Sequence, residues 1–423
     1  MRERSLASMA VMSIPPSRDL RILAGAAGLS ALGDFMAIFP LILHVQQRTG
    51  SAFAVSALIF ALWGPVVLAA GVAGAIVDRF ENRRILIAVS LVQAAVVAVM
   101  LAAVDSLWAL LPLMALLGFG VAVSQPAEFA LVPAAAGPRT DAARANGLME
   151  TARSVGFTAG PLVGGALGAA GLLRLALALN ALSFLVVAAA ALLLRARRQP
   201  LRAEGAVGAV RAREGFAFLA RERDLAITLG GAVAALALFS MSATAEPFFV
   251  TGVLGAGSLA YGALLTSWTL GMAAGSAGLA HRVGPSRLAA GGLIAVVLQG
   301  LGIVGGALSP ILWMALIGFS LGGVAHGVKN VLLRTLIHER APEALRGRAF
   351  AAYNGARNGA ELGALVLGGI AVGALGARAA LLVAGLGPAA IGATCLLLLI
   401  TRRRAAAALT TTEGRVLHAH VQG

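Results

Sequence analysis

Six of the ionisable residues inside long apolar stretches of this 423-residue chain stand out: Asp34, Glu128, Glu246, Lys329, Arg357 and Glu361. An ionisable side chain inside a membrane span costs at least ~2.5–3.5 kcal/mol on insertion scales, and such residues usually mark a pathway for ions, protons or a substrate. These positions therefore predict a proton or solute pathway through a bilayer.

Asp34 is the strongest candidate for a proton site. It lies about twelve residues into its apolar stretch, which at 1.5 Å per residue places it ~18 Å deep, near the middle of a bilayer. A carboxylate there can hold a proton in one state and lose it when water or a cation such as Arg357 or Lys329 comes near. Glu246 lies nearer the outer end of its stretch and is expected to face the same cavity with a weaker effect.

Two of the embedded cations have a second interpretation. Arg357 and Glu361 are four residues apart, so they can pair on one helix face, and that pair can be purely structural. Lys329, the only lysine, either faces the cavity or extends along its span to the inner surface.

The elements that carry these residues are apolar runs long enough to cross a membrane, for which about 20 residues suffice. The chain is 59% hydrophobic and 12% charged, against roughly 25% charged in soluble domains. The runs cover residues 22–46, 52–77, 85–104, 107–135, 145–170, 172–194, 225–252, 259–280, 288–308, 310–338, 348–374 and 377–400. The fold class expected is therefore an all-α membrane protein with twelve transmembrane helices.

The distribution of basic residues orients these spans. With twelve spans, all of the 33 Lys and Arg residues except Arg48, Arg174 and Arg378 fall on one side, which the positive-inside rule makes the cytoplasm. Both termini then face the cytoplasm. The expected segments are an N-terminal tail (1–21), a six-helix bundle (22–194), a central linker (195–224), a second bundle (225–400) and a C-terminal tail (401–423).

The two halves resemble each other. Pro40, Gly50 and Ser51 recur as Pro247, Gly257 and Ser258, and Gly118-Phe119 recurs as Gly318-Phe319. Arg153 with Gly164-Gly165 recurs as Arg357 with Gly368-Gly369. Matches that follow the span order predict two pseudo-symmetric six-helix bundles, an architecture of secondary transporters with the substrate site between the repeats.

A charged motif follows the second span: Gly74, Asp78, Arg79, Arg83 and Arg84. In place and order it resembles the inner-gate signature of the major facilitator superfamily. It departs from the common pattern at Glu81 and Asn82, and this variant resembles the branch of bacterial siderophore exporters and macrolide efflux proteins. Glu128 lies at the depth of Arg79 and Arg83 and is assigned to the same gate. A solvated basic loop is the simpler alternative.

A glycine ladder occupies the fifth span: Gly156, Gly160, Pro161, Gly164, Gly165 and Gly168. Glycines four apart share a helix face and let a partner helix approach closely. The pattern resembles the antiporter motif of drug/proton exporters in the same superfamily, which implies outward, proton-coupled transport. Plain helix packing is the alternative. Gly355, Gly359 and Gly363 form a second ladder in the eleventh span.

Other chemistries lack their motifs. The sequence contains no Walker phosphate loop, no His-Glu-x-x-His and no Gly-x-Ser-x-Gly, so no catalytic residues, metal site or cofactor are expected, and the protein is not expected to be an enzyme. Cys395 is the single cysteine, which excludes an intrachain disulfide. The net charge of +15 could suggest nucleic-acid binding, but the basic residues are spread over seven inner segments. Few aromatic residues leave the cargo unidentified.

The resemblance implies a major facilitator superfamily exporter in a bacterial cytoplasmic membrane, related to multidrug efflux antiporters. Its partners would be a small-molecule substrate such as a drug, antibiotic or siderophore-like compound, protons and the lipid bilayer, with no nucleic acid, and it would act as a monomer. Two alternatives share the fold: an uptake facilitator without a proton step, and a protein that translocates lipids or lysolipids.

Overall fold

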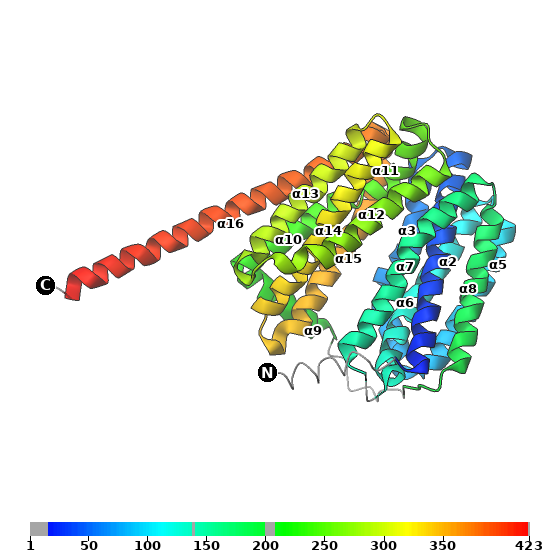
Figure 1. Ribbon diagram of the computed structural model, residues 1–423, viewed down its shortest axis with the longest axis horizontal. Coiled ribbons are helices and arrows are strands. Elements are labelled where there is room, and N and C mark those ends of the chain that lie inside the picture. The colour runs from blue at the N-terminus through cyan, green and yellow to red at the C-terminus, as the bar shows by residue number, and fades with distance from the viewer. Residues whose placement is uncertain (1–15, 138–139, 199–207, 422–423) are drawn as a thin grey trace, which may run out of the picture. The chain divides into compact units, whose positions relative to one another are not determined.

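A computed structural model describes residues 16–137, 140–198 and 208–421, and it is helical throughout these ranges, with no strand (Figure 1). The N-terminal tail up to residue 15 and the middle of the central linker lie outside the described residues. The chain divides into two compact units: unit 1 is Met1–Gly205 with Val250–Thr266, and unit 2 is Ala206–Phe249 with Ser267–Gly423.

The first half of the chain supplies seven helices to unit 1. They are α2 (Arg18–Thr49), α3 (Ala52–Leu68), α4 (Ala70–Arg79), α5 (Asn82–Ala103), α6 (Leu107–Ala136), α7 (Ala142–Ala169) and α8 (Leu173–Leu193). Helix α2 lies side by side with α7 and α8 (Figure 1). A short turn separates the first two spans: Gly50 ends α2 with φ +61°, and the Ser51 hydroxyl accepts the amide N–H of Ala54 to cap α3.

The second half contains more helices than spans. They are α9 (Gly208–Arg221), α10 (Arg223–Phe239), α11 (Ser242–Phe248), a π-helical turn (Phe249–Val253), α12 (Ser258–Gly278), α13 (Leu288–Leu308), α14 (Leu312–Arg340), α15 (Glu343–Leu375) and α16 (Ala377–Val421). Helix α12 is shared, since its first residues up to Thr266 group with unit 1.

Ten of the twelve predicted spans are long and apolar enough to cross a bilayer within the described ranges, one of them bent. Within the described ranges, nine segments are long and apolar enough to span a bilayer, and α3 with α4, bent by 54°, makes a tenth. Helices α7 and α12 are less apolar than these ten segments. Helix α7 carries polar residues such as Arg144, Glu150 and Arg153, and α12 is rich in Gly, Ser and Thr. The all-helical membrane fold is therefore confirmed, and the structure has a helical segment at each of the twelve predicted runs.

Two segments differ from the sequence prediction. Part of the predicted central linker (195–224) forms α9, whose Gly215 and Leu219 are buried within unit 2. The backbone of Arg348 in α15 approaches Gly215 so closely that a Cβ would not fit there. The C-terminal tail was expected to begin at residue 401, but α16 continues to Val421.

Candidate functional site

A buried ion pair forms the centre of unit 1. Glu128 of α6 and Arg153 of α7 lie 3.1 Å apart, and their exposed fractions are 6% and 9%. The Arg153 guanidinium also lies over the ring of Phe129, 5.6 Å from its centroid. Removing one partner of a pair buried this deeply is strongly destabilising, because the remaining charge would be buried without a counter-ion.

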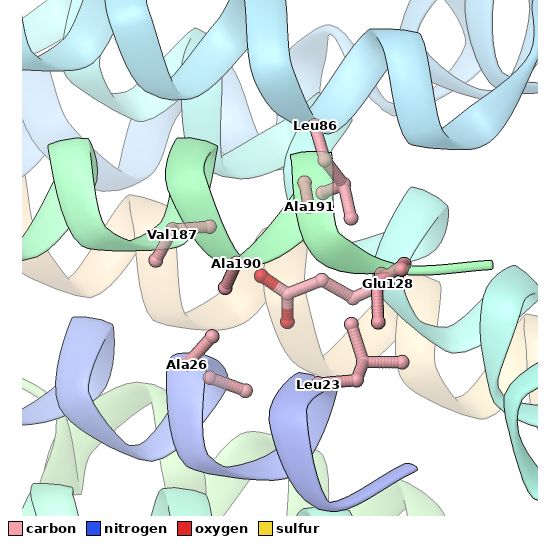
Figure 2. Close-up of a pocket in the computed structure, with 9 residues that line it drawn as sticks. Leu23, Ala26, Leu86, Glu128, Val187, Ala190 and Ala191 are labelled. Atoms are coloured by element: carbon pink, nitrogen blue, oxygen red, sulfur yellow. The ribbon is translucent and has the colours of Figure 1, made fainter. Parts of the chain in front are cut away.

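The other side of Glu128 is apolar. Figure 2 shows its carboxylate reaching between the helices that carry Leu23, Ala26, Val187 and Ala191. The cavity there is about 10 Å³, which is scarcely enough for one water molecule. Arg153 is therefore the group that compensates the Glu128 charge.

Asp34 lies in the same cluster. Its carboxylate accepts a hydrogen bond from the Asn180 side chain of α8, and Arg153 and Glu128 are the charged groups that act on it. The preceding residue, Gly33, has no room for a Cβ because Asn180 and Ser183 lie against it. Close contact between α2 and α8 thus sets the position of the Asp34 carboxylate.

The glycine ladder of α7 packs against α2. Gly156 faces the backbone of Gly28, Gly160 faces Leu32 and Phe35, and Gly164 faces the backbone of Met36. A Cβ at any of these glycines would collide with α2, so the spacing predicted the close approach correctly and the structure supplies the partner. The ladder therefore fixes the distance between Arg153, on α7, and Asp34, on α2.

One glycine of the motif has a different partner. Gly165 faces Ser258 and Gly262 in the first part of α12, within unit 1. Pro161 lies on the same surface, with its carbonyl against Gly262. Both sides of α7 are therefore in close contact with a neighbouring helix.

The predicted inner-gate motif is tied to the end of α8. Arg83 donates to the carbonyls of Ala191 and Leu192, at 2.9 and 2.7 Å. Asp78 lies 3.9 Å from Arg198, just after α8. These contacts link the loop before α5 to the chain that leaves the unit.

The remaining members of the motif have separate contacts. Arg84 pairs with Glu81 at 3.0 Å, and Arg79 lies over the ring of Phe80. No described atom lies within 4 Å of the Cβ position of Gly74. Glu128, which was predicted to belong to this gate, pairs with Arg153 and lies beside Leu86 and Ala191 near the contacts of Arg83.

Unit 2 carries an embedded cation, Lys329 of α14. It is 4% exposed, and its ammonium donates to Gln299 Oε1 of α13 at 2.8 Å and lies 3.3 Å from His326 Nδ1. The alternative in which Lys329 extends to the inner surface is wrong, because the side chain is enclosed by these two partners. Arg357 and Glu361 of α15 pair with each other at 3.2 Å, as their spacing predicted.

Glu246 of α11 is also buried, with an exposed fraction of 7%. The Ser242 hydroxyl donates to its carboxylate at 2.9 Å. Among the described residues, no cationic side chain lies within 4 Å of Glu246. A charged carboxylate without a cation is costly in an apolar setting, and taking up a proton removes that cost.

Sequence reasoning missed three members of these clusters: Arg153 and Asn180 in unit 1 and His326 in unit 2. A signal existed for Arg153, since it occupies the position that Arg357 has in the second half. Asn180 and His326 are single polar residues in apolar runs, and only the helix packing shows what they contact.

The chain can now be compared with known proteins. A sequence profile described as Major Facilitator Superfamily matches residues 23–363. No curated protein sequence matches the chain. The fold is similar to that of the nucleoside transporter NupG, at 13% identity over 90% of this chain and 99% of that one, with a TM-score of 0.72.

Two further solved structures are similar. The human organic anion transporter MFSD10 (TETRAN) is 19% identical over 91% of this chain and 100% of that one, with a TM-score of 0.60. A bacterial homologue of the human lysosomal transporter Spinster, inward-facing and unoccupied, is 16% identical over 92% of this chain and 96% of that one, with a TM-score of 0.63. At these identities the likeness concerns the fold alone.

The fold and its embedded charge clusters define a multi-pass helical membrane transporter. The chain belongs to the major facilitator superfamily, since the family profile covers residues 23–363.

Proposed function

We propose that this protein is a proton-coupled exporter of small organic molecules in a bacterial cytoplasmic membrane. The observation that carries the proposal is the charge balance in unit 1. Glu128 is balanced by its ion pair with Arg153, while no described cation lies within 4 Å of the Asp34 carboxylate, so this region holds one carboxylate in excess. One proton makes it neutral, and such a cluster can take up and release a proton as its surroundings change.

The coupling would use Asp34. Glu128 has a direct ion pair with Arg153, whereas Asp34 is half-buried and accepts its hydrogen bond from neutral Asn180. A proton on Asp34 would favour one state of the transporter, and its release to the cytoplasm would allow the return. Glu246, buried with Ser242 alone, is proposed as a second and weaker proton-sensitive group.

The proposed direction of transport and the proposed orientation of the protein in the membrane rest on sequence features. The ladder around Gly160 resembles the antiporter motif, which supports efflux and relates the protein to drug, macrolide or siderophore exporters. The positive-inside pattern supports cytoplasmic termini, with Asp78, Arg79, Arg83 and Arg84 at the inner gate. We further propose that the protein acts as a monomer.

Transport into inverted membrane vesicles tests the proposal. Loading a panel of drugs and organic acids with and without an imposed proton gradient reports direction, coupling and cargo class together. We expect gradient-dependent accumulation for the wild type and its loss in Asp34→Asn, with Glu150→Gln, an exposed carboxylate on α7, behaving as the wild type. Gradient-independent equilibration would instead identify an uptake facilitator.

A further inference from the structure

Lys329 makes its polar contacts with neutral groups. An ammonium carries three N–H donors, and here two have acceptors, Gln299 Oε1 and His326 Nδ1. Donation to Nδ1 requires the His326 proton to be on Nε2. Gln299 and His326 are themselves buried, at 2% and 9% exposure. One donor of a buried cation is left for a further partner.

No carboxylate compensates this cation directly. Among the described residues, no Asp or Glu oxygen lies within 4 Å of the Lys329 ammonium. The charged groups that act on it are Arg357 and Glu361, which pair with each other. These three residues together leave one positive charge in excess. Burying a cation without a counter-ion is costly, so an anion arriving there gains a strong charge-assisted hydrogen bond.

Aromatic rings adjoin the same histidine. The rings of Phe239, on α10, and Trp268, on α12, stack with their centroids 5.1 Å apart and an angle of 18° between their planes. The His326 ring lies 5.4 Å from Trp268 and 5.6 Å from Phe239. Phe319 meets Trp268 edge-on at 6.5 Å and holds its orientation.

These rings differ from the lysine in exposure. Phe239 and Trp268 are half-buried, whereas Lys329 and Gln299 are fully buried. Phe239 and Trp268 already stack on each other, so a flat ring can pack on the outer side of this half-buried pair while a group attached to it points toward the ammonium. The chain has only four Trp residues, and two others, Trp108 and Trp313, are 84% and 73% exposed.

We propose that unit 2 binds the cargo as an organic anion with a flat aromatic body, its carboxylate or sulfonate at Lys329 and its ring against Trp268 and Phe239. This proposal names the cargo class of the proposed exporter, so describing the bound anion as cargo rests on the proposed function. The binding site itself requires neither proton coupling nor a transport direction.

Direct binding to the purified full-length protein in nanodiscs tests the proposal, with calorimetry as the measurement. The probe is 2-naphthalenesulfonate, which stays anionic throughout the working pH range. Two matched ligands separate its features: 2-naphthalenesulfonamide is flat but neutral, and cyclohexanesulfonate is anionic but not aromatic. We expect the probe to bind at least about 10-fold more tightly than either. Equal affinity for the sulfonamide, or no binding of the probe, would overturn the proposal.

Variants locate the site. We expect Lys329→Met to weaken the probe about 10- to 100-fold, as for a lost hydrogen bond to a charged group, and Lys329→Arg to retain most of the affinity. Arg334→Gln, which removes an exposed charge from the same helix, should have no effect. Retained affinity in a folded Lys329→Met protein would refute the assignment, and size-exclusion profiles report whether each variant is folded.

A matched pair of variants tests the aromatic contact. We expect Trp268→Leu to weaken 2-naphthalenesulfonate about 3- to 10-fold and to leave cyclohexanesulfonate unchanged. Trp313→Leu is the matched control on the surface. An equal loss for both ligands would show that Trp268 only supports the fold and would refute the stacking.

The test also separates this inference from the proposed function. Binding of the probe without gradient-driven transport would retain the anion site and reject the proton-coupled exporter. Gradient-driven export of cationic or neutral drugs, with no binding of the probe, would retain the exporter and reject the anion site.

Discussion

The ion pair between Glu128 and Arg153 can be tested by a double-mutant cycle. Both side chains are about nine-tenths buried, so solvent screening is small, and the contact is a single one at 3.1 Å. Breaking a buried pair by removing one partner typically costs 3–5 kcal/mol, and the single contact places this pair near the lower value, about 3 kcal/mol. The exposed pair of Arg84 with Glu81 should contribute less than about 1 kcal/mol.

The two single variants should not be equal. Glu128→Gln leaves Arg153 opposite Asp34, whereas Arg153→Gln leaves two carboxylates with no cation in their cluster. We therefore expect Arg153→Gln to cost more than Glu128→Gln. The double variant should cost at least about 2 kcal/mol less than the sum of the two, because neither charge is then left alone.

Reversible unfolding in mixed micelles, followed by circular dichroism, measures these free energies, with Arg84→Gln as the exposed control. A coupling energy below about 0.5 kcal/mol would refute the reasoning, because the pair would then be solvated or absent in the folded protein. Equal effects of the two single variants would show that Asp34 does not depend on Arg153.

Three further predictions concern packing, coupling and topology. Gly164→Leu should abolish transport while the protein still inserts, because overpacking costs ~1–3 kcal/mol. Gly147→Leu, on an open face of α7, is the control and should transport normally. Equal activity of the two variants would show that the ladder does not pack against a partner helix. Asp34→Asn should still bind cargo but lose the dependence of transport on the proton gradient, and uphill export at the wild-type rate would leave Asp34 a structural residue. With the native cysteine removed, Ala217→Cys should react with an impermeant thiol reagent only in inverted vesicles and Trp108→Cys only in intact cells; the reverse pattern would invert the topology.

The spans and the embedded charges were predictable because both are local properties of the sequence. Twenty apolar residues in a row define a span, and Asp34 or Lys329 within one is visible without knowing any neighbour. The partners were not predictable, because they depend on how each helix is rotated about its axis. Thus Glu128 was assigned to the inner gate by depth, while its side chain points to Arg153.

The glycine ladders show the same limit. Gly156, Gly160 and Gly164 share a face that packs on α2, yet Gly355, Gly359 and Gly363, with the same spacing, have no described atom within 4 Å of their Cβ positions. Spacing predicts a flat face, but only the structure identifies the helix that packs on it, as α2 packs on the ladder of α7. Helix α9 was missed because its arginines dominate a short stretch whose apolar residues cover only one face.

The pseudo-repeat explains why the two units carry opposite charges. Arg153 and Arg357 occupy equivalent positions in the two halves, but Arg153 pairs with Glu128 of α6, whereas Arg357 pairs with Glu361 of its own helix. The corresponding region of α14 carries Lys329 in place of an acid, and Lys329 bonds only neutral groups among the described residues. One half is thereby left with a carboxylate in excess and the other with a cation in excess. The proposed proton site in the first half and the proposed anion site in the second would together suit the exchange of an acidic cargo for protons.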